Sequence, residues 1–167
     1  MRKEDDEDDD QMIRTTKSVP KSLASFYFEI KILDSGDGGV IGIGLTQADP
    51  ETRSGSFPGW PNPTLGIGYH GDDGGIYHDS HGPKFRGELY TTNDVIGCFM
   101  CRFRDGEEDV TMVQFTKNEK KVLSPKIIPN AEWHPTIGIA SDGASIDTNF
   151  GNNKFTFNPK GKFVVSL

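Results

Sequence analysis

Residues 58–80, PGWPNPTLGIGYHGDDGGIYHDS, decide the fold class of this chain. They contain a strand pattern, GIGY, then a tight acidic-glycine turn, HGDDGG, and then a second strand pattern, IYH. Asp-Gly and Gly-Gly favour a β-hairpin because turn residues must reach positive φ at little cost. A Gly/Pro-rich loop over residues 46–63 precedes the hairpin and carries Trp60 between two prolines. We therefore expect a rigid sheet that presents a long loop with an aromatic residue.

Period-two alternation outside this stretch predicts further strands. In residues 26–33, FYFEIKIL, the side chains of Phe26, Phe28, Ile30 and Ile32 are expected on one face. No stretch offers a convincing amphipathic helix, so short strands separated by turn chemistry predict an all-β fold, a two-sheet antiparallel β-sandwich. The other expected strands cover residues 40–45, 94–103, 110–116 paired with 120–123, 136–141 paired with 145–150 around Asp142-Gly143, and 163–166.

The charge is unevenly distributed along the chain. Residues 2–10 hold seven acids and two bases, whereas the other residues hold 18 acids and 16 bases. Blocks of like charge usually stay solvated, so we expect residues 1–11 to form a disordered acidic tail and residues 12–167 to form one folded domain. The domain is nearly neutral, and we see neither a basic stripe for nucleic acid nor a polybasic membrane patch.

The compartment is predicted from what the sequence lacks. It has no run of about 18 apolar residues that would span a membrane, and its first ten residues lack the apolar segment of a signal peptide. Two cysteines do not indicate a disulfide framework. We therefore expect a cytoplasmic and/or nuclear location.

Candidate chemical motifs are weak. Cys98 and Cys101 form a C-x-x-C, but their odd spacing on a strand predicts opposite faces, and no second pair completes a zinc site. His78 and His81 lie three apart in an expected loop, where that spacing indicates nothing. Residues 72–75, DDGG, lack the ligand spacing of a calcium loop. Because nucleophile and phosphate-loop motifs are also missing, we predict a protein that is not an enzyme and has no catalytic residue, metal or cofactor.

An ordered set of motifs gives a resemblance to a known family over about residues 13–157. The motifs are YFEI at 27–30, IGIGL at 41–45, PGW at 58–60 with GYHGDDG at 68–74, DVIGC at 94–98, FTKN at 115–118, and HPTIG at 134–138 with NFG at 149–151. On these residues the chain resembles a SPRY domain, most of all the SPRY domains of Ran-binding-protein-like ubiquitin-ligase scaffolds. The resemblance implies a concanavalin-like jelly roll whose loops at one edge bind a short segment or loop of a partner protein.

The resemblance also implies where the partner binds. Trp60 and Tyr69 are expected to supply apolar contact area, and Arg14, His70 and Asp142 to orient the ligand through hydrogen bonds and charge. An alternative for Trp60 is a hydrophobic plug beneath its loop, while Trp133 is expected to close the core. The complete set of expected partner-binding residues is Arg14, Thr15, Phe57, Pro58, Trp60, Tyr69, His70, Ser141 and Asp142.

Two departures from the family pattern concern turns. Asn93 stands where the family usually has Gly, which is tolerable because Asn accepts positive φ. Glu119 follows Asn118 where Gly is usual, so the hairpin there is expected to widen.

Three functions stay open at this stage. We expect a non-catalytic protein-interaction module, a monomer with a protein partner and with no nucleic-acid or membrane partner. The first alternative is an adaptor that recruits substrates to a ubiquitin ligase, although the LisH and CTLH regions of the scaffold proteins are absent from this chain. The second is a carbohydrate-binding β-sandwich, which would use aromatic platforms and acidic loops.

Overall fold

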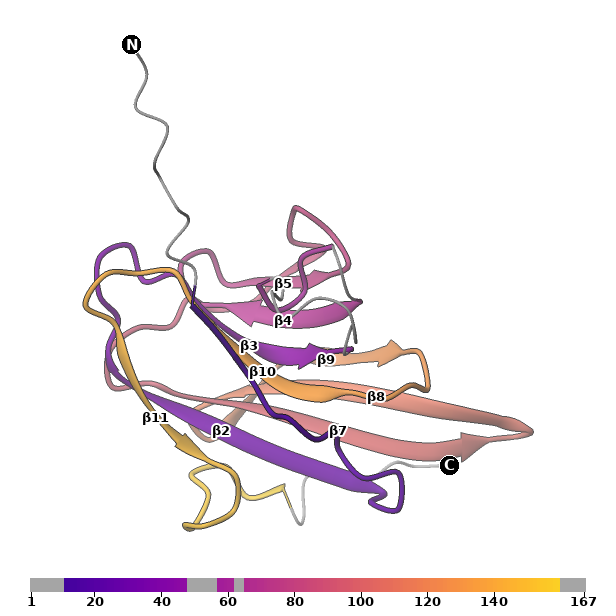
Figure 1. Ribbon diagram of the computed structural model, residues 1–167. Coiled ribbons are helices and arrows are strands. Elements are labelled where there is room, and N and C mark those ends of the chain that lie inside the picture. The colour runs from indigo at the N-terminus through magenta and orange to yellow at the C-terminus, as the bar shows by residue number, and fades with distance from the viewer. Residues whose placement is uncertain (1–10, 48–56, 62–64, 160–167) are drawn as a thin grey trace.

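Two antiparallel sheets packed face to face form the fold (Figure 1). The computed structural model describes residues 11–47, 57–61 and 65–159. Sheet A has the strand order β1-β10-β3-β4-β5-β6, and sheet B has the order β11-β2-β7-β8-β9. The strands are β1 (Gln11–Arg14), β2 (Ser25–Asp34), β3 (Ile41–Thr46), β4 (Gly66–His70), β5 (Gly75–His78), β6 (Phe85–Arg86), β7 (Val95–Asp105), β8 (Glu108–Lys117), β9 (Lys120–Ile128), β10 (His134–Ile139) and β11 (Ser145–Asn149). The predicted all-β sandwich is confirmed, and no helix in these ranges is long and apolar enough to cross a bilayer.

The core lies between the sheets and follows the predicted alternation. Phe28, Ile30 and Ile32 on β2 are fully buried, whereas Phe26 is partly buried at the edge of the same cluster. Trp133 is also fully buried, and its indole N–H donates to the carbonyl of Pro129 at 2.9 Å. Trp133 therefore closes the core as predicted.

The outer face of sheet B carries a second, smaller apolar cluster. It contains Tyr27, Phe99 and Phe157, and Cys101 packs against it. Cys98 belongs to the main core between the sheets. The two cysteines therefore lie on opposite faces of β7, as their odd spacing predicts.

The hairpin turns agree with the sequence in two places. β4 and β5 pair across the HGDDGG turn, where Gly74 has φ 65°. β8 and β9 pair across Asn118-Glu119, where Asn118 has φ 54°. Lys117 stays opposite Lys120, so this turn keeps two residues and the expected widening is wrong. Asn93 takes φ 74°, the conformation that its place in the family pattern requires.

The hairpin predicted around Asp142-Gly143 is wrong. β10 pairs with β1 and β3 in sheet A, whereas β11 pairs with β2 in sheet B. The turn is attached to the loop between β2 and β3 instead. Val40 N–H donates to Ser141 Oγ at 2.7 Å, and Asp37 N–H donates to the carbonyl of Asp142 at 3.0 Å. The chain therefore crosses from one sheet to the other at this turn.

β1 and β6 are the two edge strands of sheet A. Neither strand was predicted, because β1 has four residues and β6 has two, which is too short for alternation to reveal a strand. The expected strand at residues 163–166 and most of the acidic tail lie outside the described residues.

Candidate protein-interaction face

In its middle, the outer face of sheet A exposes main chain rather than side chains, and we call this area the glycine floor. Residues that alternate with the buried side chains of β3, β4 and β10 point outward, and in the middle of the sheet they are glycines. The segment 57–60 lies on this floor. A Cβ at Gly42 would be 2.5 Å from the Phe57 ring, and a Cβ at Gly138 would be 2.8 Å from Pro58 Cδ. Only glycine permits so close an approach of loop and sheet.

Four rings gather on this floor, and we call them the aromatic cluster: Phe57, Trp60, His70 and Tyr77. His70 stacks on Tyr77 with ring centroids 4.1 Å apart and an interplanar angle of 16°. Phe57 meets His70 edge to face at 4.8 Å, and Phe57 and Trp60 are 5.3 Å apart. Phe57 and His70 are buried, while Trp60 and Tyr77 are partly exposed. The cluster therefore has a fixed base and an accessible upper side.

Burial sets the charge state of His70. Its Nε2 lies 2.7 Å from the carbonyl oxygen of Pro58. Loss of hydration lowers the pKa of His70, and this outweighs the Pro58 hydrogen bond and the charges of Asp72 and Asp73, which act in the opposite direction. His70 is thus a neutral ring that donates to the loop and holds it on the sheet.

Trp60 has an unsatisfied donor. Its indole Nε1 is buried and has no hydrogen-bond partner in the part of the chain that the structure describes. Buried indole N–H groups usually find an acceptor. The expected plug role and the expected contact role are both compatible with this position, because the ring packs on Phe57 yet stays partly exposed.

A polar rim borders the cluster at the β4–β5 turn. Asp73 accepts hydrogen bonds from Gly75 N–H at 2.7 Å and from the Tyr77 hydroxyl at 2.8 Å, and it forms a 3.5 Å ion pair with Arg86. Burial, followed by the hydrogen bond to Asp73, raises the pKa of Tyr77 to about 12. Tyr77 therefore remains a neutral donor beside a carboxylate and a guanidinium.

The opposite edge of the face carries Arg14. It lies on β1 opposite Thr136, which shares the outward side with Gly138, and its Nη1 donates to the carbonyl of Gln47 at 3.4 Å. Thr15 follows at the end of the strand, where its carbonyl oxygen lies 2.9 Å from His134 Nδ1. Arg14 and the aromatic cluster thus belong to the same face.

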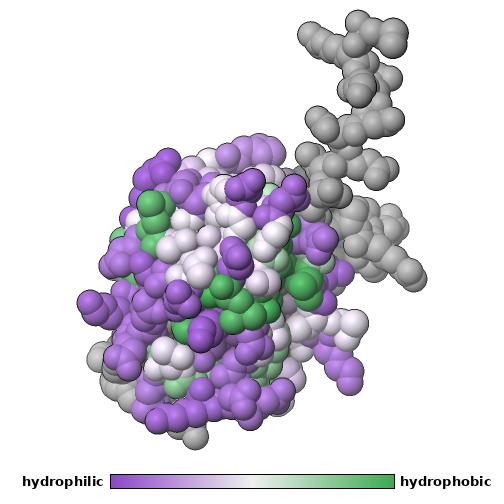
Figure 2. Space-filling view, turned by 90° about the vertical axis from the view of Figure 1, so that its left-hand side faces the viewer, coloured by the Kyte–Doolittle hydropathy of each residue, from purple (hydrophilic) through white to green (hydrophobic). Residues whose placement is uncertain are grey.

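Ser141 and Asp142 lie beyond the other end of this face. Ser141 is buried, and its hydroxyl accepts a hydrogen bond from Val40 N–H. Asp142 is exposed, and its main-chain carbonyl accepts from Asp37 N–H. This end of the molecule faces the viewer in Figure 2, where apolar side chains gather in the middle and hydrophilic ones surround them.

The structure contradicts the surface contact role expected for Tyr69. Its side chain is fully buried between the sheets, where it packs against Tyr90 and Phe115 and donates to the carbonyl of Glu88. It lies on the face of β4 opposite to His70, because adjacent residues of a strand alternate. The contact area expected from Tyr69 is therefore not available on the surface.

The structure brings Arg14, Phe57, Pro58, Trp60 and His70 onto one face, leaves Thr15, Ser141 and Asp142 at its ends, and removes Tyr69 from it. Tyr77, Asp73 and Arg86 were not among the predicted partner-binding residues. The signal for Tyr77 was available, because a hairpin with the HGDDGG turn places it opposite Gly68 on the outward side.

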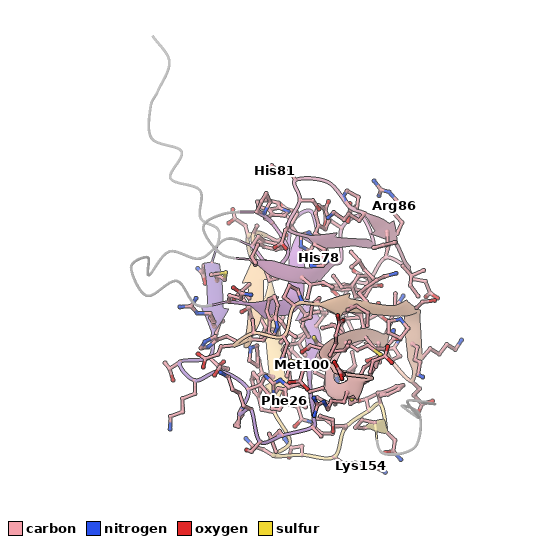
Figure 3. The ribbon with its side chains drawn as sticks, turned by 90° about the vertical axis from the view of Figure 1, so that its right-hand side faces the viewer. Phe26, His78, His81, Arg86, Met100 and Lys154 are labelled. Carbon is pink, nitrogen blue, oxygen red and sulfur yellow. The ribbon has the colours of Figure 1, made fainter. Side chains whose placement is uncertain are left out.

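His78 lies on β5, and His81 lies in the loop that follows it. Figure 3 labels His81 at the top of the molecule and His78 below it, and His78 pairs with Asp79 at 3.6 Å. Among the described residues, no group of three or more His, Cys, Asp or Glu side chains is placed to hold a metal ion.

The fold and this face define a β-sandwich that presents loops and an aromatic surface over a glycine floor. Residues 25–153 match the family model described as SPRY domain, and the chain belongs to the SPRY domain family. SPRY domains are protein-interaction modules and are generally non-catalytic.

Relatives support this assignment. The chain is 36% identical to Ran-binding protein 9 of Xenopus tropicalis over 148 residues, which are 87% of this chain and 25% of the relative. It is 34% identical to the Ran-binding proteins 9/10 homolog of Drosophila melanogaster, covering 87% of this chain and 14% of that protein. The chain therefore spans a quarter or less of the length of these two relatives. A crystal structure of a human SPRY domain matches with a TM-score of 0.68 and 28% identity, covering 87% of each chain.

Proposed function

We propose that the domain binds an extended segment of a partner protein across the outer face of sheet A, over the aromatic cluster. Trp60 carries this proposal, since its ring is partly exposed and packs against the buried ring of Phe57. Trp is also enriched among the residues that dominate binding energy at interfaces.

Charges on both sides of the cluster would fix the direction of the segment. Arg14 lies on one side, and the Asp73–Arg86 ion pair lies on the other. Phe57 and Pro58 would act indirectly, because both are buried, Phe57 packs against Trp60, and the Pro58 carbonyl is bound to His70. Ser141 and Asp142 would contact only a segment that extends beyond the end of the face.

The test compares affinity capture by the wild type with capture by Trp60→Ala and Arg14→Ala, after circular dichroism shows that each variant folds. Lys31→Ala is the matched control, since Lys31 is exposed on sheet B, away from this face. We expect Trp60→Ala to weaken binding of captured partners about 30-fold, the effect of a typical hot spot. Partners that persist with both face variants would place the binding site elsewhere.

The two alternatives are tested separately. For a ligase adaptor, a chain without residues 1–10 would keep the partner at the aromatic cluster and lose ligase subunits. For a carbohydrate-binding sandwich, a glycan array would give selective binding. The relatives are named as Ran-binding proteins, so purified Ran is one defined partner to include. A cytoplasmic and/or nuclear location stays a prediction.

A further inference from the structure

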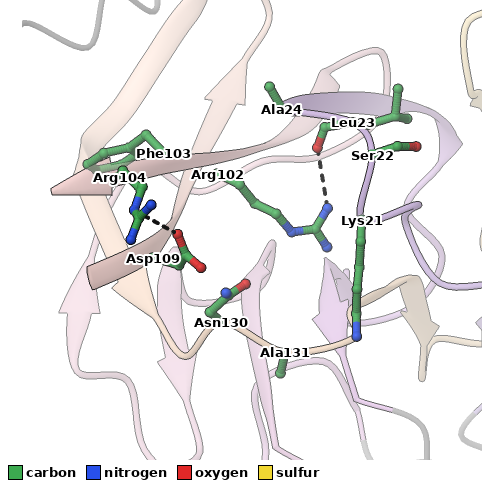
Figure 4. Close-up of a pocket in the computed structure, with 10 residues that line it drawn as sticks. All are labelled: Lys21, Ser22, Leu23, Ala24, Arg102, Phe103, Arg104, Asp109, Asn130 and Ala131. Atoms are coloured by element: carbon green, nitrogen blue, oxygen red, sulfur yellow. Dashed lines mark hydrogen bonds and ion pairs between the residues drawn. The ribbon is translucent and has the colours of Figure 1, made fainter. Parts of the chain in front are cut away.

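A cavity of about 500 Å³ lies at the end of the sandwich where β7 leaves the core. It opens between the connection from β1 to β2, the end of β7, the start of β8 and the connection from β9 to β10 (Figure 4). We call it the Arg102 pocket. The side chains that matter in its wall are Lys21, Leu23, Arg102, Arg104, Asp109 and Asn130.

Arg102 is held in place by neutral groups. Its Nη1 donates to the carbonyls of Pro20 at 2.9 Å and Leu23 at 3.4 Å, and its Nη2 donates to the carbonyl of Val19 at 3.4 Å. Its Nε is buried and has no partner within the described ranges. Three neutral carbonyl oxygens therefore orient the guanidinium, which is partly exposed and forms no ion pair with a carboxylate among the described residues.

The other charged side chains around the pocket form ion pairs with which an anion could compete. Lys21 pairs with Glu132 at 3.4 Å, and Arg104 pairs with Asp109 at 3.7 Å. All four side chains are at least 65% exposed, and such pairs are weak. A carboxylate in the pocket could interact with Lys21 and Arg104 at the rim and with the oriented guanidinium of Arg102.

We propose that the Arg102 pocket binds a carboxylate side chain from an acidic segment of a partner protein. The volume admits one or two side chains, Asn130 adds an amide to the polar wall, and Leu23, which is 41% exposed, offers an apolar edge to a neighbouring residue. This site is separate from the aromatic cluster and does not depend on the function proposed for it.

The acidic tail of this chain is a second source of carboxylates, but its starting point favours a partner instead. Gln11 pairs with Ile139 at one end of sheet A, and Arg14 pairs with Thr136 toward the other end. The chain then continues through Thr15 to Lys21 and the pocket. The tail therefore joins the domain at the end of β1 that is remote from the pocket.

The experiment measures binding of a fluorescent hexaglutamate peptide to the full chain by anisotropy, with hexaglutamine as the uncharged peptide. We expect binding of hexaglutamate alone and at least tenfold weaker binding to Arg102→Met. A Lys21→Gln/Arg104→Gln variant is altered only at exposed side chains and should also bind the peptide several-fold more weakly. If Arg102→Met does not fold, this double variant tests the proposal instead. Lys31→Gln removes one cation from the surface of sheet B and should leave the affinity unchanged.

Two results would overturn the proposal. One is equal binding by the wild type and the pocket variants, or no binding at all. The other is at least tenfold tighter binding by a chain without residues 1–10, which would make the tail itself the occupant. Trp60→Ala should bind hexaglutamate like the wild type, so failure here and failure of the aromatic face are distinguishable.

Discussion

The ring of Phe57 lies directly on Gly138, where a Cβ atom would come within 2.6 Å of two ring carbons. Gly138→Ala is therefore expected to lower the free energy of unfolding by about 1–3 kcal/mol, because the ring or strand β10 must move. Urea denaturation measures the change. Gly82→Ala is the control, since a Cβ at Gly82 would meet no atom within 4 Å. Equal effects of the two substitutions would contradict the close packing of the loop on the sheet.

Acid is expected to destabilise the fold through His70. Burial lowers its pKa below 6.5, so the unfolded chain binds a proton at a higher pH than the folded chain does. The contribution of neutral His70 to stability is complete above about pH 6.5 and is lost as the pH falls through the lower folded value. His70→Gln should flatten the dependence of unfolding free energy on pH below this point.

Chemical denaturation at a series of pH values measures this slope. His78→Gln is informative beside it, because burial also lowers the pKa of the half-buried His78. We expect His70→Gln to reduce the slope more than His78→Gln does. An unchanged slope in His70→Gln would contradict the buried neutral state.

A buried carboxylate makes the hydroxyl of Tyr27 important for stability. Glu29 is buried and accepts from the Tyr27 hydroxyl at 3.1 Å and from Thr156 N–H at 2.9 Å. Tyr27→Phe should cost about 1.5–3 kcal/mol, because it removes a hydrogen bond to a charged group. Thermal or urea unfolding measures the loss.

Tyr77→Phe is the matched control for Tyr27→Phe. It also removes a hydrogen bond to a carboxylate, at 2.8 Å from Asp73, but at a partly exposed position that water reaches. We expect a cost of about 0.5–1 kcal/mol for Tyr77→Phe. Similar costs for the two variants would mean that burial of Glu29 adds nothing.

The two cysteines are expected to react as independent thiols. Burial raises the pKa of both Cys98 and Cys101, but Cys98 lies in the core whereas Cys101 is partly exposed. Ellman's reagent should therefore modify Cys101 first, and in Cys101→Ser the remaining thiol should react only when urea unfolds the chain. Fast reaction of native Cys101→Ser, or an internal disulfide under mild oxidant, would contradict their placement on opposite faces.

Local chemistry made part of the fold predictable. The β4–β5 hairpin and the inward face of β2 follow from turn residues and alternation, which act within a few residues. The Asp142-Gly143 turn has the same local signature, but its outcome depends on Ser141 binding Val40, far away in the sequence. Turn chemistry alone cannot distinguish a hairpin from a crossing between sheets.

Trp60 could be singled out from the sequence because one Gly/Pro-rich segment carries it between two prolines. Phe57 and Pro58 were expected only from the resemblance to the family. For Tyr69 and His70, alternation required opposite faces, and only the packing of sheet B on β4 decides that Tyr69 is the buried one. The Arg102 pocket joins four separate segments, so no local pattern could reveal it.

The glycine floor has a consequence for how this domain can diversify. A loop that rests on main chain depends little on the identity of side chains beneath it, since glycines offer only hydrogen atoms. Substitutions at positions such as Trp60 therefore need no compensating substitutions at Gly42 of β3 or Gly138 of β10. Evolution or protein engineering can change the exposed side chains of this loop while the glycines below it stay the same.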